Sequence, residues 1–395
     1  MREPTPSHRL ASIDLARGLV MVVMVLDHMR DFVHREGLTG DPSDPNTTTP
    51  ALYFTRWITH FCAPTFVFLA GLSVRMQLLR GSDPAALGKA TLRRGVMFVL
   101  LEVVVLRPLM WFQFDYSFLA HLQVIWAIGW GMVGLGLLLQ WNATRLAIAP
   151  LALAIVAGHN LLPHTPFSFA TFGSGESVRT LLVGRGGIEF GTNGPVAAAQ
   201  YAIVPWLGVL LLGFAAGWLF DQTAERRRRL LLWFGALGCV AFVLLRSLHG
   251  YGDPNEWNVD PQSSWRTVFE FLRVEKYPPS LQYCLMTLGP LLLLLAAAER
   301  VRGDGRLAWI VRLGRAPLFF YVLQWAAAHL VSRLFQWIDG QPIGWDAPNP
   351  VTLQQLPPGC GFSLPVVYLA WAVGLVVLVP LTLWWERRRR RPASR

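Results

Sequence analysis

Charged residues are scarce in this sequence. Only 15% of its 395 residues are Asp, Glu, Lys or Arg, whereas 53% are hydrophobic. A soluble globular protein averages about 25% charged residues. The length alone would allow two soluble domains, but the scarcity of charge favours a polytopic membrane protein with a single domain.

Several familiar motifs are also missing. The sequence has no GxSxG, no HExxH and no nucleotide-binding fingerprint, so any chemistry must take place within the membrane domain. The glycine-rich stretch VGRGGIEFG lacks a GK[ST] ending and is interpreted as a flexible loop. The four cysteines show no CxxC spacing. We therefore predict neither a disulfide framework nor a metal site.

The positive charge of the chain does not indicate nucleic-acid binding. The formal net charge is +11, but the arginines cluster in short links between apolar stretches, as expected for orientation in a membrane. The longer loops, residues 35–58, 163–199, 249–280 and 338–362, contain far fewer Lys and Arg. Because short cytoplasmic loops are basic, we expect both termini in the cytoplasm and these longer loops outside.

Ten apolar stretches have about the length that a bilayer requires, roughly 20 residues. We predict an all-α fold: a transmembrane helical bundle of about ten spans that forms one domain over residues 1–395. The predicted spans are residues 11–34, 59–79, 95–112, 117–139, 143–162, 200–220, 229–248, 281–299, 308–337 and 363–385. Pro317 is expected to kink the long ninth span. The first span is expected to be retained rather than cleaved, since it has charges in its first turns.

The first span, SIDLARGLVMVVMVLDHMRD, carries an unusual number of ionisable residues. At about 100° per residue, Asp14, Arg17, Asp27, His28 and Asp31 fall within an arc of about 140° on one side of a helix. A charge at membrane depth is costly, so this stripe is expected to face the bundle interior. The alternative is that the charges only cap the helix at its two interfaces, which applies most readily to Asp14, Arg30 and Asp31.

A second polar cluster opens the next span in the stretch TRWITHFCAP. Arg56 and His60 are expected at the same depth as Asp27 and His28, because two antiparallel helices joined by one loop bring these ends together. Acyl transfer needs a general base and a group that stabilises the developing oxyanion. We interpret His60 or His28, oriented by Asp27, as the catalytic base, with Arg56 near the negative charge. The alternative is an interfacial histidine beside a snorkelling arginine.

Further polar residues in apolar surroundings are candidate substrate-binding residues, in addition to Asp14, Arg17 and Arg56, which we also assign to substrate binding. Glu102 is deep in the third span, where it needs a partner from another helix, and Arg17 is the leading candidate. Lys276 is expected on the outer side, just before the eighth span. The remaining candidates, which we expect to line the same cavity, are His121, Gln123 and Trp126. Gln123 could equally join neighbouring helices by hydrogen bonds.

Six stretches in a fixed order resemble the DUF1624 family of bacterial membrane proteins. They are SIDLARGLVMVVMVLDHMRD, TRWITHFCAPTFVFLAG, LQVIWAIG, PWLGVLLLGFAAG, KYPPSLQYCLMTLGP and LGRAPLFFYVLQ. That family is grouped with the catalytic domain of lysosomal heparan-α-glucosaminide N-acetyltransferase. The lysosomal enzyme is thought to use a histidine in the segment that joins its first two spans. In this chain, His34 begins that segment and His60 ends it.

The resemblance implies a membrane-bound acyltransferase in a bacterial inner membrane. Acetyl-CoA, or another acyl-CoA, would be the donor, and a sugar, envelope glycan or other small molecule at the outer side would be the acceptor. The donor phosphates would be attracted by Arg93, Arg94 or residues 226–229 on the basic face. The expected partners are these substrates and the lipid bilayer, and the sequence leaves a homo-oligomer open. The alternative function is a transporter or exporter of a small polar solute, which intramembrane charges suit equally well.

Overall fold

Helices dominate the computed structural model, which describes residues 10–37, 40–112, 117–164, 166–192, 194–301, 303, 305–345 and 359–390. The longer helices are α1 (Ala11–Val33), α3 (Cys62–Leu79), α4 (Pro84–Leu101), α6 (Val124–Gln140), α7 (Arg145–Gly158), α9 (Ile203–Ala216), α10 (Ala224–Ser247), α12 (Leu281–Ala298), α14 (Pro317–Ile338) and α15 (Leu364–Arg390). The shorter ones are α2 (Pro50–Thr59), α5 (Arg107–Trp111), α8 (Gly175–Leu182), α11 (Ser264–Leu272) and α13 (Ala308–Leu313). A π-helical turn, Glu102–Leu106, joins α4 to α5, and two short 3-10 turns, His159–Leu161 and Gly217–Asp221, extend α7 and α9.

Length and composition make the protein a helical, multi-pass membrane protein. Within the described residues, six segments are long and apolar enough to cross a bilayer: Pro50–Leu79, Ile203–Asp221, Ala224–Ser247, Leu281–Ala298, Pro317–Ile338 and Leu364–Arg389. Two shorter apolar helices, α6 and α7, accompany them. The outer face of α10 exposes Trp233, Leu237 and Leu244, as expected where a helix meets lipid rather than water. The count of ten spans remains a prediction.

The helix boundaries differ from the predicted spans at several places, among them the starts at Val124 and Ala224 instead of residues 117 and 229. The second helical segment begins at Pro50, and the third at Pro84, because Thr49 and Asp83 cap these helices through their side chains. Pro317 does not kink a long ninth span; it begins α14, and the chain turns between α13 and α14. Gly314 lies in that turn, where a Cβ atom would lie 1.9 Å from the Asp14 carbonyl oxygen. The break itself falls just before Pro317, because a proline has no N–H for an internal helix bond and is favoured at a helix start.

A small sheet corrects the prediction of an all-α fold. Its four strands are β1 (Phe118–Leu122), β2 (Ser168–Thr171), β3 (Gly186–Glu189) and β4 (Val196–Ala199), in the order β1-β4-β3-β2. β1 runs parallel to β4, β2 runs parallel to β3, and β3 is antiparallel to β4. The strands are short, and β3 and β4 consist largely of Gly and Ala, so they lack the alternation of large apolar and polar residues that predicts a strand.

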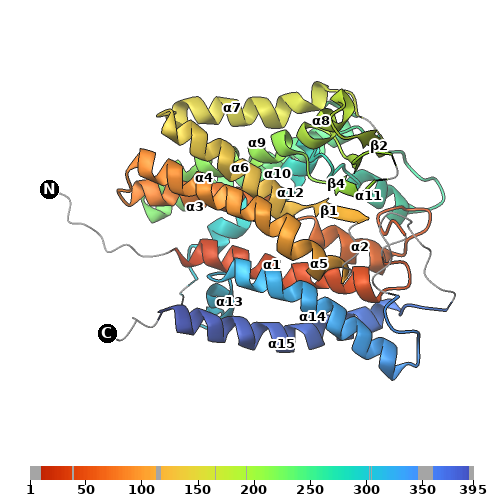
Figure 1. Cartoon of the computed structure of the whole chain (residues 1–395). Helices are drawn as coiled ribbons and strands as arrows, with labels where there is room; N and C mark the ends of the chain where they lie inside the picture. Colours follow the sequence, from red (N-terminus) through yellow and green to blue (C-terminus); the bar gives the residue numbers. More distant parts are fainter. Residues whose placement is uncertain are drawn as a thin grey trace.

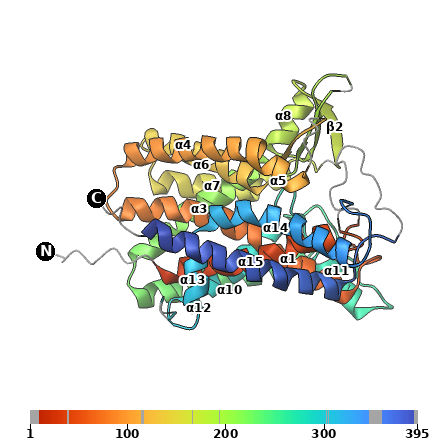
Figure 2. The same ribbon diagram turned by 60° about the horizontal axis from the view of Figure 1, so that its bottom comes forward.

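The bundle has two chemically different ends. At one, which we call the link end, short connections join α3 to α4 and α6 to α7; at the other, the loop end, lie the long loops and the sheet (Figure 1). α1 begins and α15 finishes at the link end, where Arg315 pairs with both Asp14 and Glu386. α1 packs against α3, α12, α14 and α15 and so occupies the centre of its half of the bundle (Figure 2).

Cysteine labelling can assign the two ends to compartments. Glu176 in α8 lies at the loop end and Glu225 in α10 at the link end, and both are exposed. A membrane-impermeant maleimide should modify Glu176→Cys in intact cells and Glu225→Cys only after permeabilisation, because the basic links are expected in the cytoplasm. The unsubstituted chain is the control: Cys62, Cys284 and Cys360 are buried, and any background labelling of the half-buried Cys239 is measured there and subtracted. The reverse pattern would overturn the predicted orientation.

Candidate functional site

A cavity of about 520 Å³ lies at the loop end and collects many of the predicted polar residues. We call it the loop-end cavity. The predicted residues in its lining are Asp27, His28, Arg56, His60, His121, Gln123 and Lys276. They come from α1, α2, the turn before α3, the end of β1 and the segment between α11 and α12. Elements far apart in sequence therefore supply one polar chamber.

Four charges from α1 and α2 form a compact network on the cavity wall. Arg56 places one guanidinium nitrogen 2.8 Å and 2.9 Å from the two carboxylate oxygens of Asp27. Arg30 lies 3.1 Å from the same carboxylate and also pairs with Asp31. Arg30 is off the predicted polar arc of α1, but its long side chain reaches back to both carboxylates. Two cations and two anions balance each other here, which is the condition for burying charge.

His60 is held in one orientation by the backbone. It follows the last residue of α2, and its Nδ1 lies 3.0 Å from the Arg56 carbonyl oxygen. A carbonyl only accepts, so Nδ1 must carry the proton and donate it, which leaves the Nε2 lone pair available as a base. The Tyr283 hydroxyl donates to the His60 carbonyl oxygen at 2.7 Å and fixes the turn. The arrangement is that of a neutral imidazole prepared to accept a proton.

The expected orientation of a histidine by Asp27 is corrected by these contacts. The Asp27 carboxylate hydrogen-bonds to Arg56, and it is the Arg56 carbonyl that orients His60. His28 instead lies against Trp325, with 3.9 Å between ring centroids. Its Nδ1 has no hydrogen-bond partner in the part of the chain that the structure describes.

His121 and Gln123 form a closed hydrogen-bond chain at the sheet. His121 Nε2 lies 3.1 Å from Gln200 Oε1, and its Nδ1 lies 3.2 Å from Gln123 Nε2. Burial lowers the pKa of His121 to about 4, so the ring is neutral near pH 7. A neutral ring that donates to Gln200 and accepts from Gln123 satisfies both nitrogens. These residues shape the cavity wall, and both ring nitrogens of His121 are already hydrogen-bonded.

Glu102 and Trp126 lie outside this cavity, and the predicted pairing of Glu102 with Arg17 is wrong. Glu102 accepts a hydrogen bond from the Trp126 backbone N–H at 3.0 Å, in the first turn of α6. The first N–H groups of a helix lack internal partners and favour a nearby carboxylate, which explains this choice. Arg17 pairs with Asp14 at 3.2 Å and also donates to Ser73 on α3.

A second cavity, of about 510 Å³, approaches from the link end. We call it the link-end cavity. Its lining carries four arginines, Arg17, Arg94, Arg315 and Arg389, and no carboxylate among the residues that the structure describes. Arg17 and Arg315 both pair with Asp14, at 3.2 Å each. The remaining wall is mostly apolar, so this cavity suits a long ligand with an anionic end.

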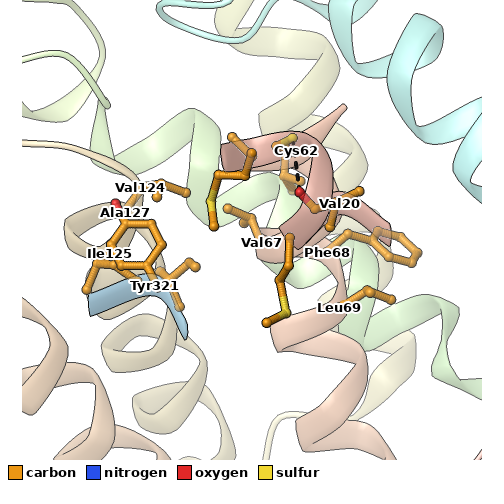
Figure 3. Packing of buried hydrophobic residues seen from close by; sticks show 14 of the residues in the cluster. Val20, Cys62, Val67, Phe68, Leu69, Val124, Ile125, Ala127 and Tyr321 are labelled. Carbon is orange, nitrogen blue, oxygen red and sulfur yellow. Dashed lines mark hydrogen bonds between the residues drawn. The ribbon is translucent and has the colours of Figure 1, made fainter. Parts of the chain in front are cut away.

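The two cavities share a wall in the middle of the bundle. Phe66, Val124 and Tyr321 line both of them. Figure 3 shows Tyr321 of α14 lying against Val124 and Ile125, with Val67 of α3 opposite. We call these three shared residues the junction. A molecule in one cavity is thus separated from a molecule in the other by a single layer of side chains.

Several lining residues were not predicted. Arg273, Tyr277 and Arg185 reach the loop-end cavity from the long loops, where the sequence suggests only turns. Burial raises the pKa of Tyr277, but Lys276 and Arg56 lower it more, so that it lies below the usual value. Arg315, in the LGRAPL block, lines the link-end cavity and was also not predicted. The signal that could have identified it is Asp14, a carboxylate in the first span that needs a cationic partner.

A comparison with known protein families gives a match over more than half of the chain. The family model described as heparan-alpha-glucosaminide N-acetyltransferase, catalytic, matches residues 9–250. A search of curated proteins found no match. Over the described part of the chain, no group of three or more His, Cys, Asp or Glu is placed to hold a metal ion. The matched region ends before α14, so it contains His60 and Arg94 but not Tyr321.

Proposed function

The chain belongs to the heparan-alpha-glucosaminide N-acetyltransferase catalytic family, and we propose that it moves an acetyl group from cytoplasmic acetyl-CoA to an outer acceptor. The acceptor would be an amine or hydroxyl group of a sugar or similar envelope molecule in a bacterial inner membrane. The observation that carries the proposal is the pair of cavities that meet at one junction from opposite ends of the bundle.

The link-end cavity fits the donor. Four arginines and no described carboxylate line it, and coenzyme A carries several phosphate charges that such a site attracts. Arg94 lies in an exposed position at the cavity, whereas Arg93 and residues 226–229, also considered from the sequence, are not in the lining. The apolar wall beyond the arginines would take the pantetheine arm and deliver the thioester to the junction.

The loop-end cavity fits the acceptor and the base. The Nε2 atom of His60 would take the proton from the acceptor amine or hydroxyl while that group attacks the thioester carbon. The carbon–sulfur bond then breaks, the acetyl group stays on the acceptor, and the proton returns from His60 to the coenzyme A sulfur. Lys276 lines this cavity beside Tyr277, and its ammonium group would bind a polar or anionic group of the acceptor.

The direct test is acetyl transfer by the purified protein. We expect release of the coenzyme A thiol that depends on an added amino sugar, together with an acetylated product detected by mass spectrometry. A protein that binds no acetyl-CoA would contradict the proposal. Movement of a small solute across proteoliposomes, without any thiol release, would favour the alternative, a transporter.

Arg94 gives a specific prediction for the donor site. Replacing Arg94 with Gln should raise the KM for acetyl-CoA about tenfold, because one charge-assisted hydrogen bond to a phosphate is lost. The difference should shrink at high salt, since exposed charges are screened. Arg93→Gln is the matched control, because Arg93 is also exposed but does not line the cavity. Equal KM values for the two variants would place the donor elsewhere.

A further inference from the structure

The oxyanion that forms during acyl transfer needs a donor, and the predicted one is already engaged. Arg56 directs a guanidinium nitrogen at both carboxylate oxygens of Asp27. Turning Arg56 toward a substrate would leave Asp27 with Arg30 alone. A different group, closer to where the two substrates meet, would perform this role without breaking the ion-pair network.

Tyr321 is the one junction residue with a polar group. Phe66 and Val124, the other residues that line both cavities, have only apolar side chains. Tyr321 is 4% exposed and belongs to α14. In Figure 3 its hydroxyl-bearing ring lies beside Val124 and Ile125 at the boundary between α14 and α6. A thioester that reaches the junction from the link end would therefore arrive beside a phenol.

The Tyr321 hydroxyl is uncommitted. Among the residues that the structure describes, no group meets it with hydrogen-bond geometry. Its polar neighbour is the indole N–H of Trp325, one turn along α14. An indole N–H can only donate, so the hydroxyl proton stays free for an acceptor oxygen. Buried hydroxyls are usually hydrogen-bonded, and an unpaired one calls for an explanation.

We propose that the Tyr321 hydroxyl donates a hydrogen bond to the carbonyl oxygen of the donor thioester at the junction. This inference rests on the proposed function and adds a catalytic residue outside the matched family region. When the acceptor nitrogen or oxygen bonds to the thioester carbon, the carbonyl oxygen becomes an oxyanion, and the tyrosine hydrogen bond strengthens. Collapse of this intermediate expels the coenzyme A sulfur and restores the carbonyl. Tyr321 keeps its proton throughout, while His60 carries the one that moves.

Tyr321→Phe removes only the hydroxyl group and is the test. Loss of one oxyanion donor typically lowers kcat by about 10²-fold, whereas the Kd for acetyl-CoA should change little because the ring remains. Tyr368→Phe is the matched control: Tyr368 pairs with Thr55, and it lines neither cavity. The control should keep kcat near the wild-type value. A Tyr321→Phe variant with wild-type kcat would overturn the inference while leaving the proposed function in place.

An infrared measurement tests the same contact without turnover. The carbonyl stretch of bound acetyl-CoA, labelled with carbon-13 at the carbonyl, should lie at lower frequency in the wild type than in Tyr321→Phe, since a hydrogen bond weakens the carbonyl bond. Equal frequencies would overturn the inference even if both variants were slow. Absence of acetyl-CoA binding by the wild type would overturn both the inference and the proposed function.

Discussion

Replacing His60 with Asn should lower the rate of acetyl transfer by about 10²–10⁴-fold, the usual effect of losing a general base. The Asn amide can still donate to the Arg56 carbonyl, as His60 Nδ1 does at 3.0 Å, so the turn between α2 and α3 should survive. What disappears is the basic lone pair of Nε2. The measurement is kcat with the purified variant, alongside acetyl-CoA binding, which should be unchanged.

Two further variants make this result specific. His249→Asn is the matched control, because His249 is exposed and lines neither cavity; it should behave as the wild type. His28→Asn separates the two candidate bases. If His28→Asn is inactive while His60→Asn works normally, the base is His28. If both variants retain full activity, neither histidine removes the acceptor proton and the mechanism is wrong.

The contact between the first two helices could be predicted from the sequence, because a charged side chain inside a membrane needs a partner. Each charge in the first span had to find a partner or a wet cavity, and a single loop joins the end of this span to the next helix. Asp27 and Arg56 could therefore be expected in one place, and they lie 2.8 Å apart. Which atom orients His60 could not be read in this way. It depends on the local turn after Thr59, where a backbone carbonyl rather than a side chain faces the ring.

Other parts of the site depend on tertiary structure that no local pattern records. Glu102 was expected to pair with a charged side chain, but its partner is a backbone N–H in the first turn of α6. Any sequence could supply such an N–H group. The sheet contains strands such as VAAA and GGIE, which are made mainly of small residues and show no alternation of apolar and polar side chains. Tyr321 is one of eight tyrosines, and only its position between the two cavities distinguishes it. Which of these residues belong to the site therefore depends on long-range packing and cannot be predicted from composition.

Replacing Asp27 with Asn should lower the free energy of unfolding by about 3–5 kcal/mol, the typical effect of removing one partner from a buried ion pair. Asp27 lies between Arg56 and Arg30, and its side chain is 14% exposed. Asn keeps the shape but cannot neutralise two guanidinium groups, so positive charge remains unbalanced. Thermal unfolding of the detergent-solubilised variant measures the loss, which should exceed that of Asp44→Asn in an exposed turn.

A double substitution shows whether the loss comes from unbalanced charge. Arg56→Met alone should also destabilise, because Asp27 then keeps only Arg30, which Asp31 also pairs with. In Asp27→Asn with Arg56→Met, Arg30 and Asp31 still balance each other, so the double variant should be less destabilised than the sum of the two single variants. Simple additivity would mean that Asp27 and Arg56 act independently.

Asp27→Asn should retain far more transfer activity than His60→Asn, because Asp27 contacts arginines rather than a histidine. The two variants are compared at temperatures where both are folded. An equal loss of activity would mean that Asp27 takes part in the catalytic step.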